Sequence, residues 1–198
     1  MRAGGGARTL AAAAPDFFEP VVGWRAWAVV QDRRRLRLRS VVFDTIWPAD
    51  AALNAGCNRV WTRIRSRLPW RSDATHDVPL WQCSCGIYAA HDPELAAEYL
   101  YLYSDVHQPR VVYRAIGLVS MWGAVVEGES GWRASNAFPK RLFLPRAQRE
   151  SDVEEICDGL ADYGVPIEIL DDGETPVARA VRRVRRDRRR RRRATQSG

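Results

Sequence analysis

The sequence predicts an α+β protein with a small curved antiparallel sheet or partly closed barrel, two helices, a zinc-stapled loop and a disordered basic tail. Strand-like apolar runs dominate both halves of the chain. Only two segments combine helical periodicity with a helix start signal. The long apolar run at residues 111–126 contains Gly117 and Gly123, where a strand can bend to close a small barrel.

The length of 198 residues suits one domain with a core of its own. The start of the chain is rich in glycine and alanine and lacks the apolar block of a secretory signal. We therefore expect a flexible leader at residues 1–20, a single α+β domain at 21–170, and an acidic linker with an Arg-rich tail at 171–198.

The first half of the domain is expected to contain strands and one long connection. Residues 21–30 are rich in Val, Trp and Ala, and in the next strand Leu36 and Leu38 alternate with arginines. Pro48 ends the strand that follows, because proline lacks the backbone N–H that a sheet needs. Residues 49–75 then form an irregular connection, and connections of this length usually carry function or need a cross-link.

The second half begins with a helix and returns to strands. Asp92 is predicted to cap a helix that starts at Pro93 and runs to about Tyr103. The long strand at 111–126 should lie at the centre of the sheet, since it is apolar on both faces. Its returning partner is expected to end at Pro139.

The last elements of the domain carry clear boundary signals. Ser151 and Glu154 make a capping box for a second helix, and Gly164 is the expected C-terminal stop. Residues 165–170 alternate apolar and polar side chains and contain a proline, which is typical of an edge strand.

Cysteine and histidine side chains flank the long connection in the pattern of a closed structural zinc site. Cys83 and Cys85 are two residues apart and precede Gly86, so the backbone can turn tightly enough for both sulfurs to reach one centre. Three thiolates and one imidazole, from Cys57, His76, Cys83 and Cys85, suit tetrahedral Zn(II). A metal so held would cross-link the two ends of the connection.

Two alternatives to a metal site are open at this point. Cys83 or Cys85 could be the nucleophile of a thiol-dependent enzyme, with His76 as its base and Asp77 as the orienting group. Alternatively, Cys57 could be a small buried hydrophobic residue and His76 a surface residue. The fourth cysteine lies on the apolar stripe of the second helix, which predicts core packing for it.

The excess positive charge lies in the tail. Residues 177–198 hold eleven arginines and one aspartate, a net +10, so the +7 of the whole chain leaves −3 for the rest. Val177, Val181 and Val184 recur at helical spacing, but like charges repel, so we expect disorder from Arg185 onward in the absence of a polyanion. The residues predicted to contact nucleic-acid phosphates without reading sequence are Arg182, Arg183, Arg185, Arg186, Arg188, Arg189, Arg190, Arg191, Arg192 and Arg193. An acidic protein is an alternative partner, and a GC-rich coding bias is an alternative source of the arginines.

The tetrapeptide Gly-Trp-Arg-Ala occurs at residues 23–26 and again at 131–134. A tryptophan beside an arginine can stack on a base or grip a planar ligand, which makes a ligand surface of Trp24, Arg25, Trp132 and Arg133 one hypothesis. The alternative is that each tryptophan lies in the core while the following arginine points outward.

With these motifs the chain resembles a family of small, functionally uncharacterised actinobacterial proteins. The shared motifs are Gly-Trp-Arg-Ala-Trp at 23–27, His-x-x-Pro with Cys-x-Cys-Gly-Ile-Tyr-Ala at 76–89, and Trp-Gly-x-Val-Val-Glu with Gly-Trp-Arg-Ala and Ala-x-Pro at 122–139. A cysteine often precedes the His-x-x-Pro in such proteins, as Cys57 does here, so the resemblance also implies a four-ligand site. Where relatives commonly have His-x-Arg this chain has Gly-Glu-Ser at 128–130, which implies the loss of any activity that needs that histidine. The resemblance implies no particular reaction.

The motifs of several enzyme classes are missing from the sequence. It contains no Gly-x-Gly-x-x-Gly, phosphate loop, His-Glu-x-x-His or Gly-x-Ser-x-Gly pattern, and no apolar run approaches the length of a membrane span. The cysteines do not form a disulfide framework, which predicts a cytoplasmic protein with no membrane partner.

The predicted function is a zinc-stabilised binding or regulatory module whose tail contacts nucleic acid. The alternatives are the thiol enzyme and a protein-interaction module that binds an acidic partner.

Overall fold

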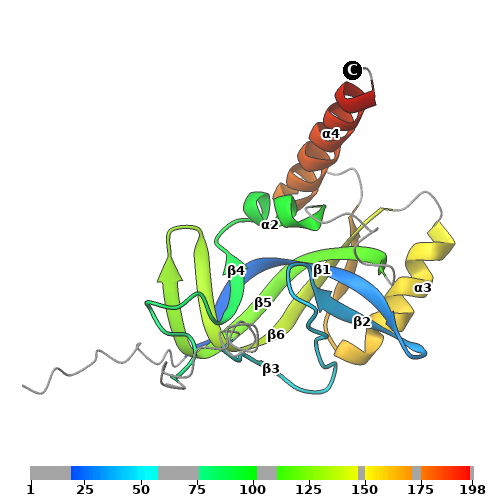
Figure 1. Ribbon diagram of the computed structural model, residues 1–198. Helices are drawn as coiled ribbons and strands as arrows, with labels where there is room; N and C mark the ends of the chain where they lie inside the picture. The colour runs from blue at the N-terminus through cyan, green and yellow to red at the C-terminus, as the bar shows by residue number, and fades with distance from the viewer. Residues whose placement is uncertain (1–18, 58–75, 102–110, 147–149, 171–174, 197–198) are drawn as a thin grey trace, which may run out of the picture.

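The computed structural model describes residues 19–57, 76–101, 111–146, 150–170 and 175–196. Within these ranges it has three α-helices and seven strands in one mixed sheet, which confirms the α+β class (Figure 1). The strands are β1 (Val21–Asp32), β2 (Arg35–Ser40), β3 (Leu53–Asn54), β4 (Ile87–Ala90), β5 (Val111–Gly128), β6 (Gly131–Pro145) and β7 (Ile167–Leu170). The helices are α2 (Pro93–Leu100), α3 (Glu150–Leu160) and α4 (Pro176–Gln196).

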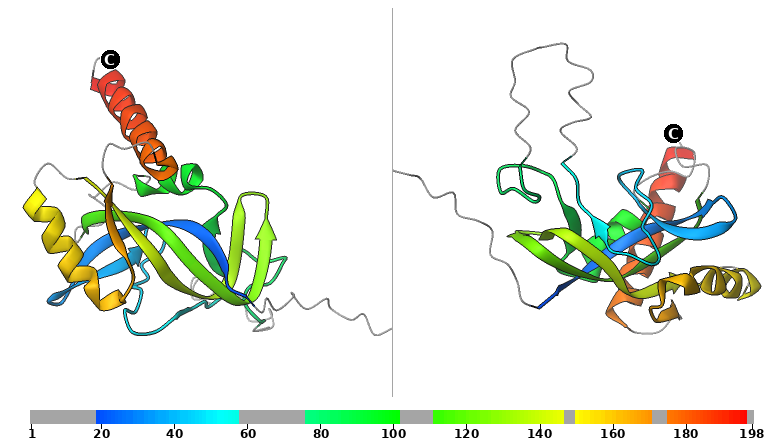
Figure 2. Two further views of the ribbon diagram at one scale, coloured as in Figure 1. Left: turned by 180° about the vertical axis from the view of Figure 1, so that it is seen from behind. Right: turned by 90° about the horizontal axis from the view of Figure 1, so that it is seen from below.

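The long strand β5 is the centre of the sheet, as its two apolar faces predict. It pairs antiparallel with β1 along one edge and with β6 along the other. Strand β4 pairs with β6 and meets β1 at a single position, Trp24 opposite Ala90. The hydrogen bonding therefore runs in a ring through β1, β5, β6 and β4, so the sheet is partly closed without forming a regular barrel (Figure 2).

Strand β5 bends at the two predicted glycines. The β5–β6 register shifts between Leu118 and Val119 and again between Trp122 and Val125. Gly123 lies in the second shift with φ +76°, a conformation that side chains with a Cβ rarely adopt. Next to the first shift, a Cβ on Gly117 would lie 2.0 Å from the Arg141 carbonyl oxygen. Glycine is thus required where the strands cross closely to curl the sheet.

The prediction that Pro139 ends the returning strand is wrong, because β6 continues through it to Pro145. Val119 lies opposite Pro139 and Leu118 lies opposite Arg141, so the strand has one extra residue at this point. A bulge of this kind leaves the local ladder incomplete, and a proline can occupy it without breaking a needed hydrogen bond.

The sheet is mixed, because one strand joins the antiparallel strands in parallel. Strand β7 pairs with β6 in parallel, from Leu142 opposite Ile167 to Pro145 opposite Leu170. Helix α3 lies between these two strands in the chain, and such a crossover returns the next strand in the same direction. In the described part of the sheet β7 pairs with β6 alone, so its predicted edge position is confirmed.

Two of the predicted helix boundaries agree with the structure, and the capping box is wrong, because α3 already includes Glu150 and Ser151 therefore lies inside the helix. Asp92 accepts a hydrogen bond from the Leu95 amide at 2.8 Å, and Pro93 follows as the first helical residue of α2. After α3 a short 3₁₀ turn, Ala161–Tyr163, leads to Gly164 in the left-handed conformation at φ +64°. The first helix ends earlier than the predicted Tyr103, because α2 stops at Leu100 and Tyr101 leaves the helical conformation as its C-cap. The leader up to residue 18 and most of the acidic linker lie outside the described residues.

The curled sheet has an apolar core on each face. Inside the curl, Trp27 and Val29 pack with Leu38 and Trp47, and the two indoles meet edge to face at 5.5 Å. On the outer face, Ala26 and Ile116 pack under α2 and the first turns of α4 (Figures 1 and 2). Successive residues such as Ala26 and Trp27 serve opposite cores because side chains alternate along a strand.

The inner core contains a buried hydroxyl that bridges two parts of the backbone. The Tyr163 hydroxyl accepts a hydrogen bond from the Leu38 amide at 2.9 Å and donates one to the Trp47 carbonyl at 2.7 Å. Burial raises the pKa of Tyr163 to about 12. The end of α3 is thus fixed to the segment that follows β2 by a polar contact that the sequence pattern did not indicate.

Tyr163→Phe is expected to lower the free energy of unfolding by about 1–3 kcal/mol, because it leaves a buried amide and a buried carbonyl without partners. Urea denaturation at neutral pH measures this difference. Tyr99→Phe is the matched control, since Tyr99 is 42% exposed and its change should stay within about 0.5 kcal/mol. Equal effects at the two positions would show that the Tyr163 hydroxyl contributes no more than a surface hydroxyl.

The prediction that the basic tail is disordered from Arg185 is wrong, because α4 is one helix from Pro176 to Gln196. Its start is capped by the Thr175 side chain, which accepts from the Ala178 amide at 3.2 Å. Val177 and Val181 are buried against the outer core, so the first turns are anchored by tertiary packing. The later arginines extend this anchored helix, and positive charge is favourable near a helix C-terminus.

Candidate metal centre

The four predicted ligands come together at one end of the sheet. The Cys57 sulfur lies 3.3 Å from His76 Nε2 and 3.8 Å from the Cys83 sulfur. The ligand atoms of Cys57, His76, Cys83 and Cys85 all lie within 4.8 Å of one another. Cys57 and His76 stand at the two ends of the segment 58–75, which lies outside the described residues. The structure therefore brings together the whole predicted set across the long connection.

The spacing of these atoms fits a small metal ion. Sulfurs about 2.3 Å from a tetrahedral ion are about 3.8 Å apart, and a sulfur and an imidazole nitrogen are about 3.5 Å apart. The observed separations of 3.8 Å and 3.3 Å are close to both values. Cys83 and Cys85 are 6% and 7% exposed, so this half of the cluster is shielded from solvent. The four residues can hold a metal ion.

The histidine is oriented by a neighbouring carbonyl. His76 Nδ1 lies 2.8 Å from the Asp77 carbonyl oxygen. Because that oxygen can only accept, Nδ1 carries a proton, and Nε2 is the ring nitrogen that faces the sulfur cluster and can offer its lone pair to a metal once it is deprotonated. Metal-binding histidines usually have their second ring nitrogen fixed in this manner.

The two buried thiols differ in their proton affinity. Burial alone would raise the pKa of Cys83. Hydrogen bonds from the Cys85 amide and from the side chains of Cys85, His76 and Cys57 outweigh burial and lower this pKa to about 7. Burial raises the pKa of Cys85, and the neighbouring charges of Cys83 and Cys57 add to that rise. Without a metal, the cluster favours one thiolate over several.

Arg133 holds the Cys-x-Cys loop in place. Its Nη1 donates to the carbonyls of Cys83 and Cys85, the second at 3.2 Å, and its Nη2 lies 3.5 Å from the Trp81 carbonyl. Its guanidinium also lies 5.8 Å from the centre of the Tyr88 ring. The sequence singled out this residue as part of a ligand surface, and the structure places it behind the candidate metal ligands.

Arg25 approaches the same strand from β1. Its guanidinium donates to the Tyr88 carbonyl and, at 3.1 Å, to the Ser40 hydroxyl, and it lies 5.0 Å from the centre of the Trp47 ring. Burial lowers the pKa of Arg25 to about 10. Both arginines of the hypothetical ligand surface therefore make contacts within the fold.

The two tryptophans of that surface are half-buried and lie against other rings. Trp24 stacks on Phe143 with the ring centroids 5.9 Å apart. Trp132 meets His91 edge to face at 4.2 Å. The structure does not bring the two tryptophans and two arginines together around one cavity, although each Trp-Arg pair lies beside β4.

The repeated Gly-Trp-Arg-Ala has a structural explanation in the position of β4. A Cβ on Gly23 would lie 2.7 Å from the Ala89 Cβ, and one on Gly131 would lie 1.9 Å from the Ala89 carbonyl oxygen. Each copy thus uses its glycine to admit β4 closely and its arginine to bind carbonyls in or next to β4. The repeat supports the short strand that follows the Cys-x-Cys loop.

Cys157 lies apart from the metal ligands. It is half-buried and packs against the inner core from α3, as the apolar stripe of that helix predicts. Burial raises the pKa of Cys157, and the nearby carboxylates of Asp158 and Glu154 add to the rise. It is therefore suitable as a control thiol.

No helix among the described residues combines the length and the apolar character needed to cross a membrane. Comparison of the chain with protein-family models, with curated protein sequences and with solved structures finds no match.

Proposed function

We propose that this protein is a zinc-stabilised binding module that contacts the phosphate backbone of nucleic acid through α4. The observation that carries the proposal is the pairing of a four-ligand cluster with a helix that begins in the core and ends as a run of arginines. The predicted membership in the actinobacterial family remains a proposal of the same kind, and it adds no reaction.

The donor set supports Zn(II) as the ion. Thiolate and imidazole ligands select zinc over calcium and magnesium, which prefer oxygen. Four protein ligands complete a tetrahedral shell and leave no position for a substrate, which is typical of a structural site. The ion would join Cys57 to the His76–Cys85 loop and so stabilise both ends of the connection.

The same geometry is less suited to the thiol-enzyme alternative. Cys83 and Cys85 are buried, and His76 Nε2 lies near the Cys57 sulfur at 3.3 Å. A nucleophile needs access to a substrate as well as an adjacent base. Resistance of these thiols to alkylation until a chelator is added would support the metal site, whereas selective reaction of one thiol in the metal-loaded protein would support the enzyme.

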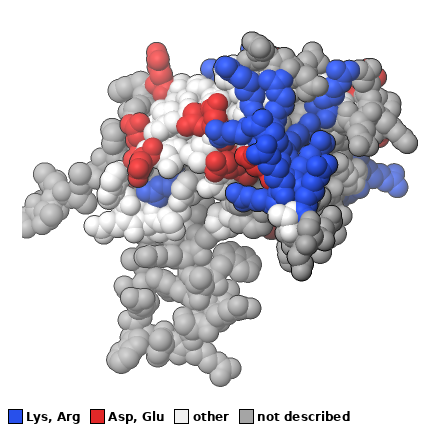
Figure 3. All heavy atoms as spheres, turned by 90° about the horizontal axis from the view of Figure 1, so that it is seen from above, with Lys and Arg blue, Asp and Glu red and all other residues white. Residues whose placement is uncertain are grey.

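The shape of α4 supports contact with nucleic acid. The helix rises from its base beside α2 and extends away from the sheet (Figure 1). Viewed from above, basic side chains gather in one dense region (Figure 3). Arg179, Arg182, Arg183 and Arg186 lie at i, i+3, i+4 and i+7 and so share one face of this helix. An array of fixed positive charges on a projecting element suits a polyanion, and a major groove about 12 Å wide admits an α-helix.

The purified protein is expected to contain about one zinc per chain and to bind duplex DNA with little dependence on sequence. Elemental analysis measures the zinc, and fluorescence anisotropy at several salt concentrations measures the binding. With about six phosphate contacts, affinity should fall about 10³-fold between 50 and 200 mM salt. Affinity that is independent of salt, or the absence of bound metal in a folded protein, would contradict the corresponding half of the proposal.

A further inference from the structure

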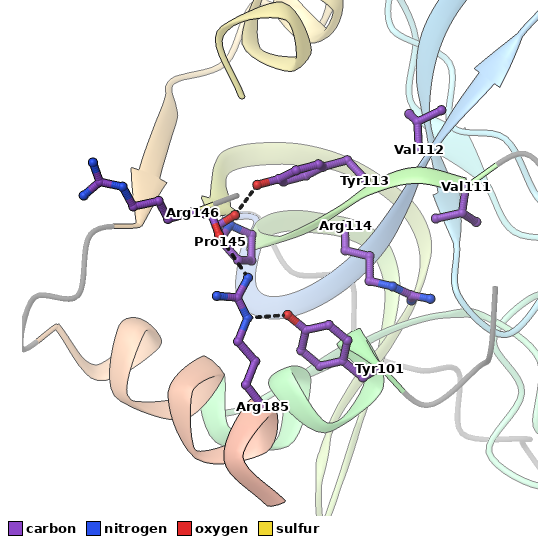
Figure 4. Close-up of a pocket in the computed structure, with 8 residues that line it drawn as sticks. All are labelled: Tyr101, Val111, Val112, Tyr113, Arg114, Pro145, Arg146 and Arg185. Carbon is purple, nitrogen blue, oxygen red and sulfur yellow. Dashed lines mark hydrogen bonds between the residues drawn. The ribbon is translucent and has the colours of Figure 1, made fainter. Parts of the chain in front are cut away.

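A second basic site lies at the base of α4, where that helix meets α2, β5 and the end of β6. It is a cavity of about 220 Å³ (Figure 4). Among the described residues its lining contains three arginines, two tyrosines and no carboxylate: Tyr101, Val111, Val112, Tyr113, Arg114, Pro145, Arg146 and Arg185. A cavity with this lining is complementary to an anion.

Arg185 is held in this cavity by neutral groups. Its Nε donates to the Tyr101 hydroxyl at 2.7 Å, and its Nη2 lies 3.3 Å from the Arg146 carbonyl oxygen (Figure 4). Neither acceptor carries a charge, and no carboxylate of the described residues lies within ion-pair distance of Arg185. Its guanidinium is therefore fixed in position with its positive charge available to a ligand.

Tyr101 contributes a second donor. Its hydroxyl accepts from Arg185 Nε, so its own proton remains for an acceptor in the cavity. The guanidinium carbons of Arg114 and Arg188 lie 5.8 Å and 5.2 Å from the centre of the Tyr101 ring. These nearby cations add positive potential around the Tyr101 hydroxyl, which favours an anion there.

Arg114 adds charge from the floor of the sheet. It is buried, with 9% of its surface exposed, and its Nη1 donates to the Leu100 carbonyl at 2.7 Å. The Arg146 side chain points away from Arg114 and Arg185 and forms the outer rim (Figure 4). The cavity thus combines the buried guanidinium of Arg114, the fixed guanidinium of Arg185 and the hydroxyl of Tyr101 around a space large enough for a phosphate group.

We propose that this cavity binds a phosphate group, with Tyr101 and Arg185 as direct donors and Arg114 supplying positive potential. The phosphate could belong to a nucleic-acid backbone lying along α4 or to a small phosphorylated molecule. The inference does not depend on the metal or on duplex binding by the rest of α4, because the cavity is formed by the described parts of α2, β5, β6 and α4.

The test is titration of the full-length protein with inorganic phosphate at constant ionic strength, followed by isothermal calorimetry and by NMR of the arginine side chains. Saturable binding with a Kd of about 1 mM is expected. Tyr101→Phe should weaken it about threefold to tenfold, and Arg185→Gln at least about tenfold. Arg190→Gln removes the same charge from an exposed position outside the cavity and should weaken it less than about twofold.

Competition separates the two sources of phosphate. If duplex DNA displaces inorganic phosphate, the site is a seat for the nucleic-acid backbone; if both bind together, it takes a small phosphorylated ligand, and either result supports the proposal. Absence of saturable phosphate binding in the folded protein, or equal losses for Arg185→Gln and Arg190→Gln, would overturn it. Tyr101→Phe retains the ring that Arg114 and Arg188 contact, so it tests the site even where Arg185→Gln lowers stability.

Discussion

Cys85→Ser is expected to lose the bound zinc and to lower the free energy of unfolding by more than about 3 kcal/mol. Cys85 is buried and shares its cluster with three other ligands, and the binding energy of a structural metal is part of the folding energy. A serine hydroxyl is a poor zinc ligand, and in the metal-free protein three remaining ligands would be left close together without an ion. Elemental analysis together with urea denaturation measures both effects.

Cys157→Ser is the matched control. The same substitution is made at a half-buried thiol outside the cluster, so zinc content should stay at the wild-type value while stability falls only modestly. Loss of zinc from this variant would identify a wrong ligand set. A Cys85→Ser protein that is as stable as the wild type, or a wild-type protein that a chelator leaves fully folded, would show that the metal does not stabilise the fold.

Replacement of all six arginines at 188–193 by glutamine is expected to lower duplex affinity at least about 100-fold at 50 mM salt and to reduce the salt slope by up to about 5. These residues lie on the part of α4 beyond the buried Val177 and Val181, so the domain should stay folded. Replacement of the same six residues by lysine keeps the charge and should retain most of the affinity, because phosphate contact needs charge more than a particular side chain.

Deletion of the whole of α4 is a poorer test of its role in nucleic-acid binding than substitution of the arginines near its C-terminal end. Deletion of residues 177–198 would remove four buried side chains from the outer core, Val177, Ala178, Ala180 and Val181, and so would lower stability as well as charge. Undiminished DNA binding by the six-glutamine variant would contradict the assignment of α4 and direct attention to the folded body. Equal losses in the glutamine and lysine variants would show that α4 is not recognised through its charge.

The sequence by itself determined those features that depend on local chemistry. Asp92 followed by Pro93 predicts a helix start, and Gly164 predicts a helix end, because the cap and the left-handed residue act within a few positions of the chain. The glycines at 117 and 123 predict the bends of β5 for the same reason. The metal ligands were identifiable because thiol and imidazole groups in this number have few other uses near one turn.

Only the tertiary structure decided the features that depend on distant partners. Pro139 lies within β6 because that strand has a bulge there, opposite β5, and α4 is ordered because Val177 and Val181 bury against α2 and the sheet. Arg25 and Arg133 contact the carbonyls of a loop and strand more than 40 residues away, which no local pattern shows. Tyr101 and Arg185 meet for the same reason across 84 positions of the chain. Propensity and charge act on neighbouring residues, whereas packing and hydrogen bonding across the fold are set by which surfaces remain to be buried once the sheet has curled.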